Sequence, residues 1–306
     1  MMEGFDQWDL EVAQGVAIHG RSAGTGPPVV LLHGHPRAHT TWHRVAPELV
    51  RRRRTVVCPD LRGYGRSSKP APDPDHERYC DRTMAADVVA VMDQLGHDTF
   101  AVAGHDRGQG VAYRTAMDHP GRVTALAVLD GLPHIEQVER VDARFATQWW
   151  HWFFFAGSPH AERVITADPD AWYGLDGRAR DAMGAENFEY VSAALHDPLT
   201  VRAMLEDYRA GMGVDLEHDR QDRAVSRRIQ CPTLVAWSTR DDMEDLYGDL
   251  VPLWEPWVAG RISRARIDSG HHMAEENPEQ LAQVLGDFLD STGRTDSGTV
   301  RTEPAP

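Results

Sequence analysis

Short runs of apolar residues recur along the chain, and stretches of helical period separate most of them. The runs cover residues 29–32, 55–58, 100–103 and 125–129, and each is followed by a polar loop. Parallel strands that are buried on both faces give continuous apolar runs of this kind. Residues 8–20 instead alternate apolar and polar positions, which is typical of a strand with one exposed face. Strands alternating with helices predict a mostly parallel, doubly wound α/β sheet.

This pattern stops after Pro133 and returns about a hundred residues later. Residues 134–228 have a helical period, are rich in Trp, Phe and Asp, and contain no buried strand run, whereas strand patterns resume at 232–237 and near 264–267. We therefore expect a helical cap inserted into a sheet domain. The expected limits are 1–133 and 229–290 for the core domain, 134–228 for the cap and 291–306 for a disordered tail.

The composition narrows the class of function. The 306 residues carry a formal net charge of −15, which argues against a nucleic-acid surface because phosphate binding needs a dense basic face. No apolar stretch approaches the roughly 20 residues that span a bilayer, and the acidic start of the chain does not resemble a secretory signal. Three widely spaced cysteines fit neither a disulfide framework nor a metal site. We expect a cytoplasmic protein without cofactor, metal or membrane contact.

Residues 100–108 predict a sharp turn from a buried strand into a helix. Asp106 is at the centre of this turn, with Gly104 two residues before it and Gly108 two residues after it. The glycines let the backbone crowd into a tight bend, and the following helix directs its amides at the apex. A carboxylate there attacks an sp³ carbon, displaces a leaving group and becomes an alkyl ester. The plainer alternative is an aspartate that only caps the helix.

The expected partners of this nucleophile follow in chain order. His271, directly after Gly270 and the last strand pattern, is the predicted base for a water that hydrolyses the ester, in preference to His272. Two carboxylates compete to orient its imidazole. Asp130 follows the run at 125–129, and Asp241 follows the strand at 232–237.

The oxyanion that forms during ester hydrolysis needs hydrogen-bond donors. The predicted donors are the backbone amides of Arg107, directly after the nucleophile, and of His35 in the turn that follows the run at 29–32.

With these residues in place, the chain resembles a known family. The run Gly104-His105-Asp106-Arg107-Gly108, with His33-Gly34-x-Pro36 and the segment at 42–47 before it, is similar to the fluoroacetate (haloacetate) dehalogenases of the α/β-hydrolase superfamily. The similarity covers residues 29–289. It implies an α/β-hydrolase fold with a cap and a short 2-haloacid as substrate. It also implies that Arg107 binds the substrate carboxylate and that Asp130, rather than Asp241, is the third member of the triad.

The cap carries the most specific part of the resemblance. The family binds the departing halide with a His-Trp pair and a more distal Tyr, which correspond here to His151, Trp152 and Tyr208. Three N–H and O–H donors in a dry pocket stabilise the charge that develops on a leaving halide, each typically by ~3 kcal/mol. The plainer alternative for these residues is an aromatic core of the cap.

The chain departs from the family at two positions near the nucleophile. The family has a second arginine four residues after the nucleophile, where this sequence has Gly110, and His35 stands where an aromatic residue is usual. The loss of one charge favours a larger or uncharged substrate. Arg37, just past the oxyanion turn, is our candidate for the missing charge.

The leading hypothesis is therefore hydrolytic dehalogenation of a haloacetate-like acid to the 2-hydroxy acid and halide, by an enzyme that the family precedent makes a homodimer. Cleavage of C–F bonds as opposed to C–Cl bonds does not follow from the sequence. The alternative is an epoxide hydrolase with the same Asp106, in which two cap tyrosines among Tyr173, Tyr190 and Tyr208 protonate the epoxide oxygen. A third hypothesis, a catalytically silent ligand-binding protein, has no need of Asp106 and His271 together.

Overall fold

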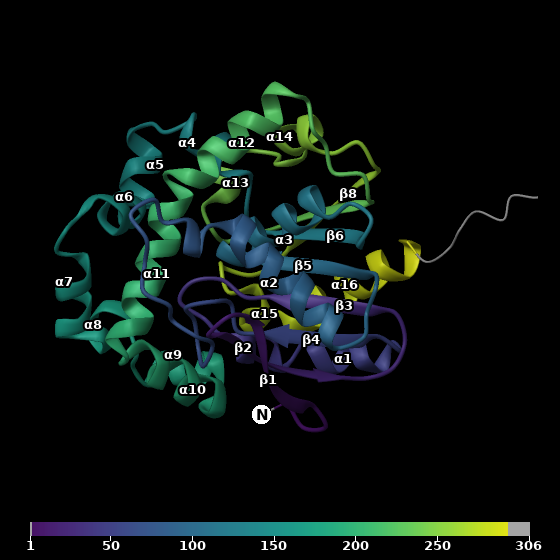
Figure 1. The fold of residues 1–306 in the computed structure, drawn as a ribbon, viewed down its shortest axis with the longest axis horizontal. Coiled ribbons are helices and arrows are strands. Elements are labelled where there is room, and N and C mark those ends of the chain that lie inside the picture. Colours follow the sequence, from purple (N-terminus) through teal and green to yellow (C-terminus); the bar gives the residue numbers. More distant parts are fainter. Residues whose placement is uncertain (1, 293–306) are drawn as a thin grey trace, which may run out of the picture.

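An eight-stranded sheet forms the centre of the protein (Figure 1). The computed structural model describes residues 2–292. Its strands are β1 (Asp6–Ala13), β2 (Val16–Ala23), β3 (Pro28–Leu32), β4 (Thr55–Pro59), β5 (Phe100–His105), β6 (Val123–Leu129), β7 (Thr233–Ser238) and β8 (Ile262–Ile267). They are ordered β1-β2-β4-β3-β5-β6-β7-β8, and every neighbouring pair from β4 to β8 is parallel. The predicted mostly parallel sheet is confirmed.

The first strand prediction is wrong in one respect. Residues 8–20 were expected to form one strand, but they belong to the hairpin of β1 and β2, which pair antiparallel. Gly15 turns the chain between them with φ of 71°, a conformation that glycine adopts without steric cost. The alternation of polar and apolar residues continues through both strands, so it did not reveal the turn.

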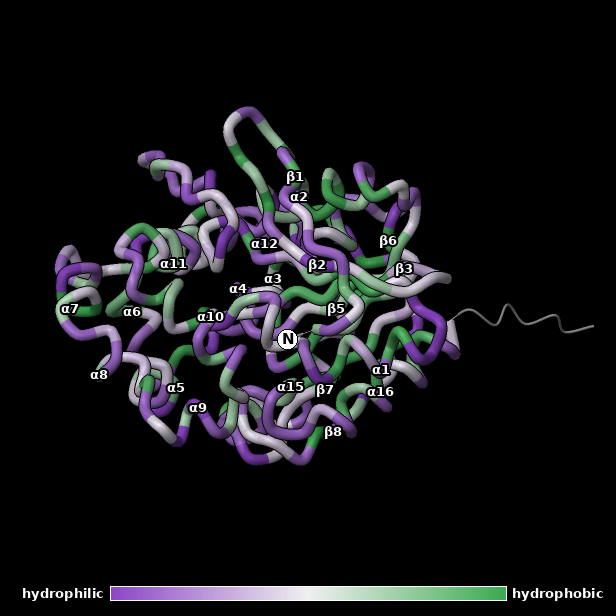
Figure 2. The backbone as a smooth tube through the Cα atoms, turned by 90° about the horizontal axis from the view of Figure 1, so that it is seen from below, coloured by the Kyte–Doolittle hydropathy of each residue, from purple (hydrophilic) through white to green (hydrophobic). Residues whose placement is uncertain are grey.

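Helices cover both faces of the sheet, and this explains the continuous apolar runs. On one face, α2 (Asp81–Gln94) and α3 (Arg107–Asp118) pack against residues such as Val102. On the other face, α1 (Ala46–Arg51) and α16 (Pro278–Thr292) pack in a second cluster with Ala101. Successive residues of β5 therefore enter opposite cores, and the tube of Figure 2 is hydrophobic along this strand.

All elements between β6 and β7 are helices, and most of them gather beside one edge of the sheet domain (Figure 1). They are α4 (His134–Val138), α5 (Ala143–Gln148), α6 (Trp150–Gly157), α7 (Ala161–Ala167), α8 (Pro169–Tyr173), α9 (Gly177–Met183), α10 (Ala185–Leu195), α11 (Pro198–Gly211) and α12 (Val214–Ala224). The later helices are α13 (Met243–Tyr247), α14 (Val251–Trp254) and α15 (Met273–Glu276). None of the helices within residues 2–292 is long and apolar enough to cross a membrane.

The end of the chain differs in part from the expectation. Ser291 and Thr292, which were expected in a disordered tail, are the last residues of α16. Residues 293–306 of the predicted tail lie outside the described residues.

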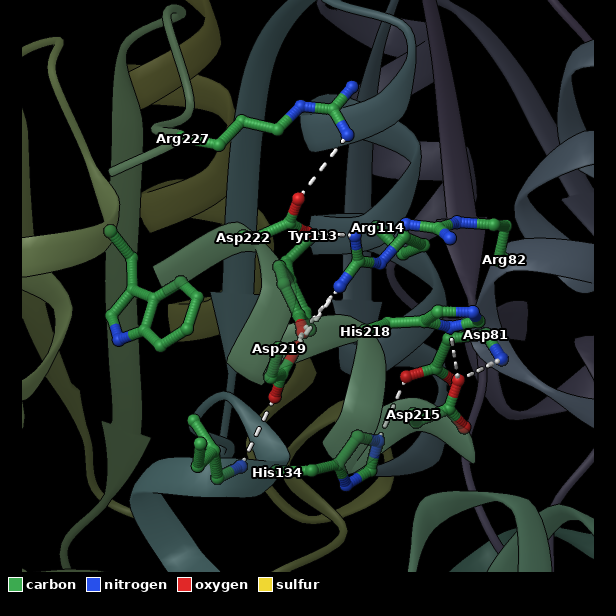
Figure 3. A network of polar contacts seen from close by, with 12 residues as sticks. Asp81, Arg82, Tyr113, Arg114, His134, Asp215, His218, Asp219, Asp222 and Arg227 are labelled. Carbon is green, nitrogen blue, oxygen red and sulfur yellow. Dashed lines mark hydrogen bonds and ion pairs between the residues drawn. The ribbon is translucent and has the colours of Figure 1, made fainter. Parts of the chain in front are cut away.

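A buried polar network fastens α12 to the sheet domain (Figure 3). Arg114 of α3 donates to Asp219 at 3.0 Å and also pairs with Asp222, both on α12. Asp215, one turn before Asp219, accepts the backbone N–H of Asp81 at 3.0 Å. The helix that follows Asp106 is thus tied directly to the end of the helical segment.

Candidate active site

The turn after β5 has the predicted shape of a strand-to-helix elbow. Asp106 has φ of 51° and ψ of −120°, and α3 begins at the next residue. A Cβ at Gly104 would lie 2.1 Å from the backbone oxygen of Gly108, and a Cβ at Gly108 would lie 2.3 Å from that of His33. Both positions therefore need glycine, because any side chain would clash with backbone. The strained φ holds the Asp106 side chain at the end of the strand.

Asp106 is a stabilised carboxylate with one oxygen bound and one turned to the predicted base. Its Oδ1 accepts the backbone N–H of His35 at 2.6 Å, and the backbone N–H of Arg107 also interacts with the carboxylate. Its Oδ2 lies 3.7 Å from Nε2 of His271. Burial by itself would favour the neutral acid, but His271 and these amides hold the pKa of Asp106 well below its ordinary value. Asp106 is therefore an anion throughout the neutral range.

His271 is flanked by both candidate acids, and it hydrogen-bonds to the one that the sequence analysis ranked second. Nδ1 of His271 lies 2.9 Å from Oδ2 of Asp241 and 3.7 Å from Oδ2 of Asp130. Asp130 instead accepts hydrogen bonds from Ser238, from its backbone N–H at 2.8 Å and from its hydroxyl at 2.7 Å. The hydrogen-bond geometry therefore favours Asp241 as the orienting acid, whereas the sequence analysis preferred Asp130.

The two acids also differ in charge. Burial raises the pKa of Asp130 to about 7, in spite of the nearby His271 and its bonds to Ser238. The pKa of Asp241 is lowered, because its interaction with His271 outweighs its partial burial. At neutral pH, Asp241 is therefore the carboxylate that matches an imidazolium, whereas burial favours the neutral form of Asp130.

Three side chains of the helical segment line the same cavity as Asp106. His151 and Trp152 lie on α6, and Tyr208 lies on α11. The Tyr208 ring lies 6.1 Å from that of His151 and 5.9 Å from that of Trp152, measured between centroids. Burial lowers the pKa of His151 to about 4, and it raises that of Tyr208 well above its ordinary value. A neutral imidazole, an indole and an un-ionised phenol are all available as donors.

Arg107 lines the cavity but is paired with an acid of the protein itself. Its Nε donates to Oδ1 of Asp207 at 3.0 Å, and its Nη2 donates to the same carboxylate and to the backbone oxygen of Asp207 at 3.0 Å. Its guanidinium also lies over the rings of Tyr208, at 4.9 Å, and of Trp152, at 5.9 Å. The predicted carboxylate-binding charge is therefore partly neutralised by Asp207.

Arg37 does not supply a second charge to the cavity, and that hypothesis is wrong. Its Nε donates to both oxygens of Glu275, at 3.0 and 3.2 Å, and it is not among the residues that line the cavity. The space beside Gly110 is occupied instead: a Cβ there would lie 2.4 Å from Oδ2 of Asp81.

The cavity has a volume of about 250 Å³, and both polar and aromatic side chains line it. A single water needs roughly 10–15 Å³ of such volume. A haloacetate is about as large as five waters, so the cavity is larger than such a substrate. Sequence reasoning missed His134, Gln109, Gln137 and Asp242 among the lining residues. The available signal was their position, because His134 and Asp242 follow the carboxyl ends of β6 and β7, where ligand sites of such sheets lie.

Several clusters among residues 2–292 have the residue types of metal ligands. Asp81, His134 and Asp215 bring ligand atoms within 4.8 Å of one another, as do His105, Asp130 and His271. Hydrogen bonds within the first cluster, such as His134 Nε2 to Asp81 at 2.8 Å, account for its geometry without an ion.

Comparison with known proteins identifies the family. The model described as alpha/beta hydrolase fold matches residues 27–278. The chain belongs to the alpha/beta hydrolase fold family. Within this family it is 39% identical to a fluoroacetate dehalogenase of Burkholderia sp, over 94% of this chain and 95% of the relative. It is 31% identical to a soluble epoxide hydrolase of Corynebacterium sp. (strain C12), over 90% of this chain and 94% of the relative.

Solved structures of the alpha/beta hydrolase family give the same picture. Protein ALR0039 from Nostoc sp PCC 7120 matches with a TM-score of 0.89 and 37% identity, and the match covers 94% of this chain and 99% of that one. The epoxide hydrolase CorEH matches with a TM-score of 0.82 and 27% identity, covering 94% of this chain and 99% of that one. The predicted fold, an α/β-hydrolase with helices on both faces of the sheet, is confirmed.

Proposed function

We propose that this protein is a hydrolytic dehalogenase of short 2-haloacids, with Asp106 as its nucleophile. The supporting observation is the position of Asp106 in a cavity that three neutral donors also line, those of His151, Trp152 and Tyr208. The similarity to a fluoroacetate dehalogenase over nearly the whole chain points to the same reaction.

In the first step, Oδ2 of Asp106 attacks the halogen-bearing carbon. The new C–O bond forms as the carbon–halogen bond breaks, and the halide leaves with the bonding electron pair toward the donors of His151, Trp152 and Tyr208. Oδ1 remains bound to the His35 amide at 2.6 Å, so the remaining oxygen carries the attack. The product of this step is an ester of Asp106 and a free halide.

In the second step, His271 removes a proton from a water, which attacks the carboxyl carbon of the ester. In the free enzyme, burial opposes the charge of His271, but Asp106 and Asp241 raise its pKa well above the ordinary value. Ester formation removes the charge of Asp106 and with it part of this stabilisation, so the imidazole becomes available as a base. The amides of His35 and Arg107 bind the oxyanion on Oδ1, and collapse of the intermediate releases the 2-hydroxy acid.

The decisive experiment is to trap the ester. The His271→Ala variant is incubated with chloroacetate, and the peptide that contains Asp106 is weighed by mass spectrometry. We expect a carboxymethyl adduct on Asp106 and one halide released per active site, followed by little further turnover. An unmodified peptide, together with no halide release by the unaltered enzyme from fluoro-, chloro- or bromoacetate, would refute the proposal.

Epoxide hydrolysis is the second candidate, and one observation favours it. Tyr173 and Tyr208 both lie beside the ring of His35, with centroids at 5.8 and 5.3 Å, and burial raises the pKa of both phenols. A pair of O–H donors near Asp106 is what epoxide opening requires. Tyr190 does not belong to this pair, because its hydroxyl donates to Asp60 at 2.6 Å. Opening of a styrene-oxide-type epoxide at a higher kcat/KM than chloroacetate hydrolysis would favour this candidate.

The assembly and the domain limits belong to the same proposal. Trp150 and Phe153 on α6 and Val164 on α7 are 50%, 37% and 45% exposed, and exposed apolar side chains on neighbouring helices are the support for a homodimer formed there. The three cysteines are free thiols, which supports a cytoplasmic location. Size-exclusion chromatography with light scattering tests the dimer.

We propose residues 134–228 as the cap and residues 1–133 and 229–290 as the core.

A further inference from the structure

His134 is a buried histidine in the wall of the catalytic cavity. It begins α4, directly after the loop that follows β6, and its ring lies 6.3 Å from that of Trp152. Its Nε2 forms a 2.8 Å hydrogen bond with Oδ2 of Asp81, which is also buried. Figure 3 shows the two side chains facing each other at the edge of the polar network.

Gly110 makes room for this pair. A Cβ at position 110 would lie 2.4 Å from Oδ2 of Asp81 and 2.9 Å from its Oδ1. A side chain there would therefore displace the Asp81 carboxylate from its present position beside His134. The missing side chain at 110 and the His134–Asp81 pair are therefore parts of one arrangement.

The pair carries charge into the cavity wall. Burial opposes the charge of both groups, yet the pKa of His134 is raised by Asp81 and that of Asp81 is lowered by His134. This is the behaviour of an imidazolium–carboxylate ion pair. Arg107 lies close enough to affect the pKa of both side chains, so two cationic groups occur on the same side of the cavity.

Three N–H donors of this wall lack acceptors among the described residues. Nδ1 of His134 and Nε2 of Gln109 are buried without a hydrogen-bond partner. The hydrogen bonds of Arg107 use Nε and Nη2, so its Nη1 also donates to no described residue. Buried donors are seldom left unpaired in folded proteins, and a carboxylate with its two oxygens accepts several hydrogen bonds at once.

We propose that His134, held by Asp81, is a specificity-determining residue that binds the carboxylate of the 2-haloacid together with Arg107. The inference rests on the proposed dehalogenase function and adds the group that selects an anionic substrate. The second cation therefore comes from the start of α4, because position 110 of α3 is a glycine and supplies no charge. An uncharged haloamide of the same size lacks the charge that His134 recognises.

The test compares chloroacetate with 2-chloroacetamide as substrates of His134→Gln. The glutamine keeps an N–H donor and removes the charge. We expect KM for chloroacetate to rise about tenfold or more, because a charge-assisted hydrogen bond is lost, with kcat within about threefold. KM for 2-chloroacetamide should change less than about twofold. Asp81→Asn should likewise raise KM for chloroacetate and leave KM for 2-chloroacetamide nearly unchanged, because His134 then loses its counter-ion.

His196→Gln is the matched control, because His196 also pairs with an acid, Asp170 at 3.3 Å, but is exposed on the helical segment. It should leave both KM values unchanged. An unchanged KM for chloroacetate in His134→Gln overturns the inference, and so does an equal rise for both substrates.

A measurement on the unaltered enzyme removes any dependence on the folding of the variants. Acetate should inhibit chloroacetate turnover competitively with an inhibition constant at least about tenfold lower than that of acetamide, since charged hydrogen bonds are the stronger ones. Equal inhibition overturns the inference. The ester trapped on Asp106 in His271→Ala separates the two levels. An ester without selection between acid and amide refutes only the role of His134, whereas no ester from any haloacid refutes the proposed function as well.

Discussion

The two walls of the catalytic cavity are built in different ways. On the sheet side, the reacting groups stand at strand ends, and backbone amides hold them: Asp106 follows β5, and the His35 amide lies 2.6 Å from its Oδ1. On the helical side, side chains of α6 and α11 face the nucleophile, and what positions them is the packing of rings against one another. The first wall depends on backbone geometry and the second on side-chain packing.

This difference separates chemistry from selection. Groups fixed by backbone hydrogen bonds tolerate little variation, and in the proposed mechanism they form and hydrolyse the alkyl ester. Groups that are set by ring packing can be exchanged one at a time, and they determine which leaving group and which substrate fit. The similarity of the chain to both a dehalogenase and an epoxide hydrolase agrees with a shared sheet wall and a variable helical wall.

The substitution with the largest expected effect on this comparison is at Asp106, the proposed nucleophile. Asp106→Asn should lower kcat by about 10⁴-fold or more, because the reaction then has no route through an ester. Halide release measured beside the unaltered enzyme gives the result. The φ of 51° at this position suits asparagine as well as aspartate, so the melting temperature should stay nearly constant. Turnover that stays within tenfold would contradict a covalent mechanism.

A second substitution on the sheet wall distinguishes the two acids beside His271. Asp241→Asn should lower the rate of ester hydrolysis by about 10²–10⁴-fold, since Asp241 makes the 2.9 Å bond to Nδ1 of His271. Asp130→Asn should cost about tenfold or less. Rapid-quench measurement of ester decay isolates this step. The reverse order of the two effects would make Asp130 the orienting acid, as the resemblance to the haloacetate dehalogenases implied.

On the helical wall, a single donor should matter less. Tyr208→Phe removes one hydroxyl and should lower the rate of halide displacement by about 10²-fold. The loss should be greatest for fluoroacetate and smallest for bromoacetate, because fluoride needs the most stabilisation as it leaves. Equal losses for all three haloacetates would show that Tyr208 shapes the cavity without binding the halide.

The smallest expected effect concerns stability. The pKa of Asp130 is raised by burial to about 7, so the folded protein holds a proton at this position between about pH 4 and 7 that the unfolded chain releases. This contribution to the free energy of unfolding is present at low pH and is lost as the pH rises through 7. Relative to the unaltered protein, Asp130→Asn should therefore become more stable at pH 8 than at pH 5, by a few kcal/mol at most. Urea unfolding at the two pH values measures this difference, and a pH-independent difference would contradict it.

The parts of the site that the sequence predicted are those with local causes. Gly104 and Gly108 must be glycine because backbone atoms lie within 2.3 Å of their Cβ positions. Residues close together in the sequence are therefore enough to predict the turn. Chain order and the strand patterns then located His271. The predicted fold has the same origin, since each buried parallel strand leaves its own apolar run.

The parts that the sequence did not predict depend on long-range packing. Asp130 and Asp241 follow strands β6 and β7, which are neighbours in the sheet, so both reach the histidine. Only the bonds of Asp130 to Ser238 separate them. The sequence could not show the partner of Arg37 for a similar reason, because Glu275 comes from a distant part of the chain. His134 lies in no motif, so its place after the carboxyl end of β6 was the one sequence signal for it.

The ion pair between Arg107 and Asp207 has a consequence for traffic into and out of the cavity. Asp207 also accepts the hydroxyl of Tyr64 at 2.6 Å, and all three side chains are buried. An outward movement of α11 would separate this buried pair, so the contact opposes an opening of the cavity on this side. In the proposed reaction, haloacid and halide should therefore pass between side chains that rotate aside, and a crystal of this protein should exchange them without change in its lattice.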